Sequence, residues 1–173
     1  MRRRQHGGTL LEFTLVGIPL IFVLISTVEI ARGMWIYEML GHAVRQGVRF
    51  TAVKGQNCAT SPNSCAVTIG RIAQEMQKAG VGLDPAVFTN VTFTAYAGRT
   101  ITHATLQDCL ADTTQWPTAA GTTDAGAAVG ADIEISVQYP FRTPISMLWP
   151  GAGRSSSAGL FYFPASSRES IQF

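Results

Sequence analysis

The hydrophobic pattern of this chain begins with a long apolar run near the N-terminus. Residues 13–28 contain no charged side chain, and a partial extension over residues 29–31 brings the apolar stretch to about 20 residues, enough for a helix to cross a bilayer. Glu12 immediately precedes this run. Pro19 lies inside it, and its missing amide predicts a kink or local melting of the helix.

The helix is predicted to continue beyond the apolar run, because apolar residues recur there at spacings of 4, 3, 4, 3 and 4. Such spacing is typical of one face of an amphipathic helix. We expect one helix over residues 9–53, with Gly55 as its stop. Its apolar stripe packs either on its own domain or on a sister subunit. The stripe is Ile30, Met34, Tyr37, Gly41, Val44 and Val48, and the polar side is Glu38, His42, Arg45 and Arg49.

The rest of the chain predicts a small α+β domain with one extra short helix and three or four antiparallel strands. Pro140 is expected to end the clearest of these strands. The predicted elements are a helix at about residues 66–79, strands at about 91–96, 99–106, 132–139 and 160–163, and loops at 112–130 and 149–159.

These patterns divide the chain into three parts. Residues 1–7 form a basic leader that processing would remove, residues 8–54 form the long helix with a membrane span at about 10–31, and residues 55–173 form the domain. The leader arginines predict a cytoplasmic N-terminus, which places the domain outside the cytoplasm. The net charge is only +2, so nucleic-acid binding is not expected.

With three cysteines, one thiol stays unpaired whichever two form a disulfide. Cys58 and Cys65 flank a turn-rich loop that a disulfide could close, and Cys109 could instead pair with either one. The loop-closing disulfide in an oxidising compartment is the favoured interpretation. No C-x-x-C occurs and no histidine has zinc-finger spacing, so no metal site is predicted.

The chain offers little that points to catalysis. His103 lies near Asp108 and Cys109 in sequence, but groups this close along the chain rarely form a triad by themselves. Residues 151–155 resemble a phosphate loop without its lysine or its strand-to-helix context. We therefore predict no enzyme activity and no cofactor.

The N-terminal segment has three interpretations. A cleaved signal peptide is disfavoured, because the apolar run is too long and no small-x-small cleavage site follows it. An uncleaved signal anchor is the second. The third starts from the sequence GGTLLEF at residues 7–13, which resembles the processing site of type IV pilin-like proteins, where a prepilin peptidase cuts after a glycine.

That resemblance implies roles for four residues. The family's glutamate is fifth in the mature chain, so a cut after Gly7 fits Glu12, whereas a cut after Gly8 would make Glu12 the fourth residue. Glu12, accompanied by Phe13, would meet the N-terminal amine of a neighbouring subunit. An amine and a carboxylate in a membrane each cost less when paired, and we expect Glu12 in the first helical turn to face the positive end of the helix dipole.

Residues 29–35, EIARGMW, and residues 43–52, AVRQGVRFTA, resemble the TadE-like family, small pilin-like proteins of the tight-adherence (Flp) pilus machinery. The resemblance covers about the first 55 residues. It implies a sheet laid on the exposed half of a long helix and a minor pilin or pseudopilin in the bacterial inner membrane, with a periplasmic domain and incorporation into an extracellular pilus as one outcome. Its partners would be pilin-like subunits, the assembly platform, prepilin peptidase and membrane lipid.

Two other functions remain open on the sequence. A signal-anchored extracytoplasmic binding domain unrelated to pili predicts an intact leader. A membrane-tethered hydrolase predicts a pocket that holds His103 or another polar cluster.

Overall fold

The computed structural model describes residues 7–54, 67–95, 99–117, 129–144 and 160–172. The chain forms two compact units, the first made of residues 1–35 and 143–159 and the second of residues 36–142 and 160–173. Helix α1 (Gly7–Ala52) contributes to both. It continues through Pro19 without a break, so the predicted local melting is not seen.

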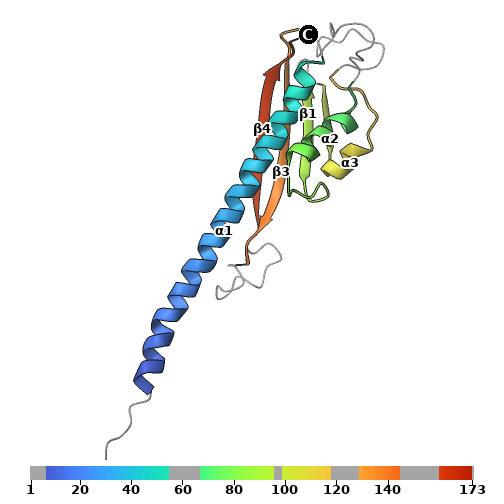
Figure 1. The fold of residues 1–173 in the computed structure, drawn as a ribbon. Helices are drawn as coiled ribbons and strands as arrows, with labels where there is room; N and C mark the ends of the chain where they lie inside the picture. The colour runs from blue at the N-terminus through green and yellow to red at the C-terminus, as the bar shows by residue number, and fades with distance from the viewer. Residues whose placement is uncertain (1–6, 55–66, 96–98, 118–128, 145–159, 173) are drawn as a thin grey trace, which may run out of the picture. The chain divides into compact units, whose positions relative to one another are not determined.

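The second unit contains a four-stranded antiparallel sheet in the order β2-β1-β3-β4 (Figure 1). Short helices and the C-terminal part of α1 complete it, and together they confirm the predicted α+β class. The elements besides α1 are α2 (Ile69–Ala79), β1 (Thr89–Ala95), β2 (Thr100–His103), α3 (Leu106–Leu110), β3 (Asp132–Arg142) and β4 (Leu160–Ser170).

The core of this unit lies on one face of the sheet. Residues in β3 alternate between buried and half-buried from Asp132 to Pro140, as expected for an antiparallel sheet with only one covered face. Phe93 of β1 lies directly opposite Ile135 of β3, and both side chains are fully buried. Thr92 pairs with Ser136, so the other face of the sheet is polar.

Two strands are longer than their hydrophobic patterns predict. The expectation that Pro140 ends its strand is wrong, because β3 runs on to Arg142 and Pro140 pairs with Tyr162. The pairing between β1 and β3 reaches only as far as Gln138, and proline is tolerated where one side of a strand lacks a partner. Strand β4 extends to Ser170 because its pairing with β3 continues to Asp132, and its position at the sheet edge tolerates a polar sequence.

Helix α3 was not predicted and replaces the end of the expected strand at residues 99–106. A capping box begins it: the Asp108 amide donates to Thr105 Oγ1 at 3.1 Å, and the Thr105 amide donates to Asp108 Oδ2 at 3.1 Å. This reciprocal pair satisfies two amides that a helix start otherwise leaves open. The T-x-x-D spacing was therefore a readable signal for a helix.

The packed face of α1 is rotated from the predicted stripe. Val44 and Val48 are fully buried as expected, but Ile30, Met34 and Tyr37 are each more than half exposed. Gly47 explains the rotation, because an added Cβ there would lie 2.6 Å from Met76 Cγ of α2. The buried face is Leu40, Ala43, Val44, Gly47, Val48 and Thr51, and the predicted polar side of Glu38, His42, Arg45 and Arg49 is exposed.

Candidate functional site

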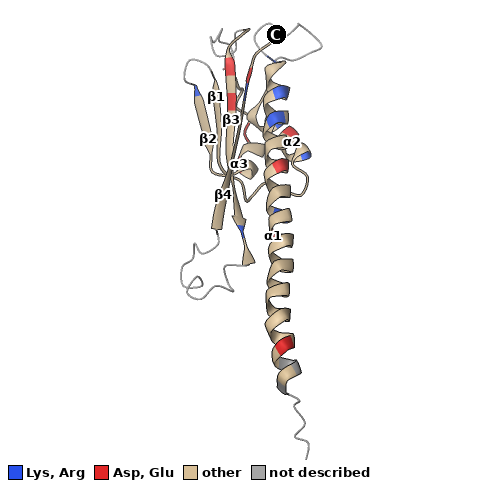
Figure 2. Ribbon diagram, turned by 90° about the vertical axis from the view of Figure 1, so that its left-hand side faces the viewer, with Lys and Arg blue, Asp and Glu red and all other residues tan. Residues whose placement is uncertain are grey.

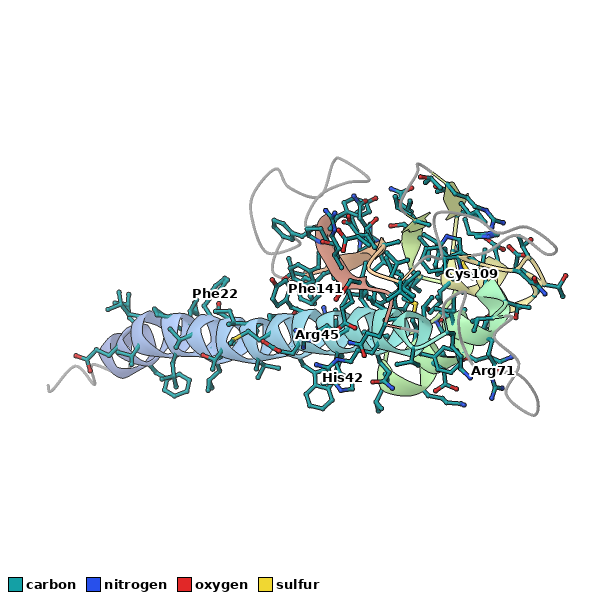
Figure 3. The ribbon with its side chains drawn as sticks, turned by 90° about the horizontal axis from the view of Figure 1, so that it is seen from above. Phe22, His42, Arg45, Arg71, Cys109 and Phe141 are labelled. Carbon is teal, nitrogen blue, oxygen red and sulfur yellow. The ribbon has the colours of Figure 1, made fainter. Side chains whose placement is uncertain are left out.

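The part of α1 that lies in the first unit presents an apolar surface to solvent. Exposed fractions reach 77% for Phe13 and 71% for Leu15, and Phe22 projects outward from the helix (Figure 3). The ribbon in Figure 2, coloured by residue type, shows this part of α1 almost free of acidic and basic residues. Among the described residues, α1 is a helix that is long enough and apolar enough to cross a membrane. A continuous exposed apolar surface of this kind marks contact with a membrane or with another protein.

Two threonine hydroxyls in this segment are satisfied by carbonyls of the helix itself. Thr14 Oγ1 donates to the Leu11 carbonyl at 3.0 Å, and Thr27 Oγ1 donates to the Val23 carbonyl at 2.8 Å. Such bonds hide hydroxyl groups from an apolar environment. The segment can therefore enter lipid without leaving these donors unpaired.

Glu12 is the one charged residue between residues 11 and 28, and its side chain is exposed. It is the sixth residue of α1, and no acidic residue lies in the first turn. The expectation of a first-turn position is therefore wrong, since α1 begins at Gly7 rather than Thr9. The influence of the dipole falls off within the first turn, so the dipole does not account for this carboxylate.

The other end of the apolar run carries a local ion pair. Arg32 Nη2 donates to Glu29 Oε2 at 3.0 Å. The Glu29 side chain is only 13% exposed and that of Arg32 is 47% exposed. Glu29 thus has its partner within the same helix.

The remaining predicted site residues are placed only in part. Gly7 is the first residue of α1, and an atom added at the Gly8 Cβ position would meet nothing within 4 Å. Cys58 and Cys65 lie outside the described residues, so their predicted disulfide stays a prediction. Cys109 is a buried free thiol.

The acidic partner of His103 is Asp112. His103 Nε2 lies 2.9 Å from Asp112 Oδ2, although the ring N–H is not aligned for a hydrogen bond. Burial opposes ionisation of Asp112, but hydrogen bonds from Thr114 and the charge of nearby His103 outweigh it and lower the Asp112 pKa. Sequence reasoning named Asp108 instead, which caps α3.

Cys109 lacks the properties of a nucleophile. Burial, followed by the charges of Asp108 and Asp112, raises the pKa of the Cys109 thiol to about 12. Its Sγ donates to the Thr105 carbonyl at 3.3 Å. A reactive cysteine needs an exposed thiolate in electropositive surroundings, and Cys109 has neither.

We expect native Cys109 to resist alkylation. At pH 8, iodoacetamide should modify it at least about 100-fold more slowly in the folded protein than in denaturant, because the thiolate fraction follows the pKa. Peptide mapping by mass spectrometry measures the rate at this residue. Equal rates in the two conditions would show an accessible thiolate and would support the hydrolase alternative.

A groove of about 800 Å³ lies in the second unit, and its lining does not include His103. Tyr37 and Arg45 of α1 and Ala165 of β4 contribute to it. Within the described ranges, no group of three or more His, Cys, Asp or Glu could hold a metal ion. The groove therefore does not hold His103, although polar side chains such as Glu38, Asn90 and Glu134 line it.

Comparisons with known proteins single out α1. A family model described as TadE-like protein matches residues 7–49, which include the exposed apolar segment, Glu12 and the Glu29–Arg32 pair. Searches of curated proteins and of solved structures found no match. The resemblance inferred from the sequence is confirmed for this segment alone: residues 7–49 are similar to the TadE-like protein family.

Proposed function

We propose that this protein is a minor pilin or pseudopilin of a tight-adherence (Flp) pilus system and acts in pilus assembly through helix packing. One observation carries the proposal. The exposed apolar segment of α1, with Glu12 as its lone charge over residues 11–28, lies within the TadE-like match at residues 7–49.

The exposed apolar surface of α1 suits two environments in succession. In the bacterial inner membrane it contacts lipid, with the basic leader in the cytoplasm and the domain in the periplasm. During assembly it packs on the helices of pilin-like subunits, the assembly platform or both. Transfer from lipid to a helix interface removes no apolar surface from water, so close packing and polar pairing decide the association.

Apolar side chains at the end of the span and just beyond it extend this contact surface. Ile30, Met34 and Tyr37 have the spacing of one helix face and exposed fractions of 63%, 65% and 53%. Since the protein's own fold leaves them largely exposed, the proposal assigns them to contacts with sister subunits. This is the second of the two roles that the sequence left open for the stripe.

Glu12 provides the polar element of the same contact. A cut after Gly7 would create an amine at Gly8, and Glu12 would meet that amine on a neighbouring subunit. A charge near the bilayer centre costs about 2.5–3.5 kcal/mol and less toward the interface. Pairing with a cation offsets this cost and so favours one register between helices.

The proposal is tested by the intact mass and N-terminal sequence of the protein purified from its native membrane. We expect a chain that starts at Gly8, as prepilin peptidase cleavage after Gly7 would leave it; a start at Thr9 would move the cut to Gly8. A chain that retains Arg2–Arg4 would favour the signal-anchored binding domain. A start beyond Ala31 would contradict every proposal that keeps the protein in the membrane.

A further inference from the structure

The groove of about 800 Å³ in the second unit follows both faces of the edge strand β4. Its lining includes Pro164–Ser167, and successive side chains of a strand point to opposite faces of the sheet. Ala165 lies opposite buried Val137 on the core face, whereas Ser166 lies opposite Ser136 on the polar face. The groove therefore passes around the free edge of β4, and this path suits a chain-like ligand better than a compact one.

A row of hydroxyl groups crosses the polar face of the sheet within this groove. Thr92 of β1 lies opposite Ser136 of β3, which in turn lies opposite Ser166 of β4, and all three residues line the groove. Since neighbouring strands are about 4.7–4.9 Å apart, the three hydroxyls are regularly spaced. Each hydroxyl can both donate and accept a hydrogen bond. The row therefore offers a repeating set of polar contacts to a ligand that crosses the strands.

A β-bulge places a pair of amide side chains beside this row. The pairing of β1 with β3 shifts register between Thr89 and Thr92, and Asn90 in the bulge has a φ of 52°, which is uncommon for a residue other than glycine. Asn90 Nδ2 donates to Gln138 Oε1 at 3.1 Å, and both residues line the groove. The bond leaves Asn90 Oδ1 as an acceptor and Gln138 Nε2 as a donor for a ligand. Bulges re-aim side chains next to functional sites, so the backbone strain at Asn90 supports a binding role for the pair.

The composition of the lining indicates the class of ligand. Nine of the fourteen lining residues are Glu, Arg, Asn, Gln, Ser or Thr, whereas pockets for drug-like molecules are mostly apolar and peptide specificity comes from side-chain pockets. The Arg45 guanidinium lies over Gly41, with Nη1 and Nη2 each 3.8 Å from where a Cβ would be. Together with Glu38 and Glu134, one arginine and two glutamates give this lining a net charge of −1. Such a lining suits a ligand that is rich in hydroxyl groups and carries no negative charge.

We propose that this groove binds a neutral oligosaccharide. A glycan presents donors and acceptors along its whole length, which the hydroxyl row, the Asn90–Gln138 amide pair and the charged side chains can meet. A site built to hydrogen-bond hydroxyl groups discriminates strongly against ligands that lack them. The inference goes beyond the proposed function, and it depends only on residues of the second unit.

Solution NMR of the ¹⁵N-labelled full-length protein tests this site. The protein is kept in micelles of lauryldimethylamine oxide, a detergent without a sugar headgroup, and is titrated with neutral trisaccharides of glucose, mannose, galactose or N-acetylglucosamine at millimolar concentration. We expect at least one of them to shift the side-chain amide signals of Asn90 and Gln138 saturably. Asn90→Gly suits the positive φ and removes the amide, so the Kd followed at Gln138 should rise at least about fivefold. Thr100→Ala is the matched control, because Thr100 is exposed on the same sheet face outside the groove lining, and it should leave the Kd unchanged.

Several results would overturn the oligosaccharide site. They are the absence of a saturable shift with every trisaccharide, and an unchanged Kd in Asn90→Gly whose backbone amide spectrum shows it to be folded. Tighter binding of the acidic trisaccharide trigalacturonate would assign the groove to anionic ligands, and shifts caused only by a short neutral peptide would assign it to a protein partner; either result contradicts the proposal. Cleavage after Gly7 is measured separately by intact mass, so failure of glycan binding leaves the proposed function standing.

Discussion

Replacement of Glu12 by alanine is expected to reduce assembly at least about tenfold while the protein stays in the membrane. The substitution removes the only charge from residues 11–28, so insertion into lipid becomes easier rather than harder. A contact with a neighbouring amine worth about 1.4 kcal/mol or more corresponds to at least a tenfold loss of assembled subunits. Counts of surface pili and the yield of sheared pilus protein measure the effect.

Glu29 supplies the matched control for this prediction. It is the other acidic residue near the apolar run, but its partner is Arg32 of the same helix at 3.0 Å. Glu29→Gln should therefore leave assembly within about twofold of the wild type, as local helix ion pairs contribute only a few tenths of a kcal/mol. Normal piliation of Glu12→Ala, or an equal loss in both variants, would refute the subunit contact assigned to Glu12.

Replacement of Trp116 by alanine should have the largest effect on the stability of the second unit. Trp116 is fully buried and meets Phe93 edge to face with ring centroids 5.6 Å apart. Truncation of a buried tryptophan to alanine costs about 3–5 kcal/mol, a large fraction of the roughly 5–15 kcal/mol that stabilises a domain. Thermal unfolding of detergent-solubilised protein, followed by circular dichroism, should show Tm lower by about 10–20 °C.

Two further variants show whether burial is the cause. Trp35 is 56% exposed, so Trp35→Ala should change the free energy of unfolding by no more than about 0.5 kcal/mol. Trp116 Nε1 is buried without a hydrogen-bond partner in the part of the chain that the structure describes. Trp116→Phe should thus cost less than Trp116→Ala, because it keeps a ring and removes an unsatisfied donor. Equal Tm values for Trp35→Ala and Trp116→Ala would contradict the buried position.

The extent to which sequence predicted the fold depends on whether each signal was local. The apolar run and the alternation around Ile135 are local patterns, and both gave the correct element. The rotation of the packed face of α1 depends on the approach of Met76 to Gly47, which involves another helix. Strand β4 beyond Phe163 has no apolar pattern because it lies at the sheet edge, and only its pairing with β3 reveals it.

The same distinction holds for the candidate site. Glu12 stood out because a charge at an apolar run is visible in the sequence, whereas its turn in the helix depended on where α1 begins. Asp112 was missed as the partner of His103 because its position depends on packing. The backbone carbonyl of Asp112 accepts from the Gly70 amide at 2.9 Å, and a Cβ at Gly70 would lie 2.8 Å from that oxygen.

The polar edge strand β4 matters where many copies of the protein are concentrated. Under the proposed function, subunits in a membrane or a filament would hold their sheets at high local concentration, where an open edge promotes strand-to-strand aggregation. Pro164 removes one backbone donor from β4, and Arg168, bound to Asp132 at 2.6 Å, places a charge on the same strand. Both features discourage sheet extension. The polar sequence that made β4 hard to predict thus also disfavours pairing between β4 strands of neighbouring copies of the domain.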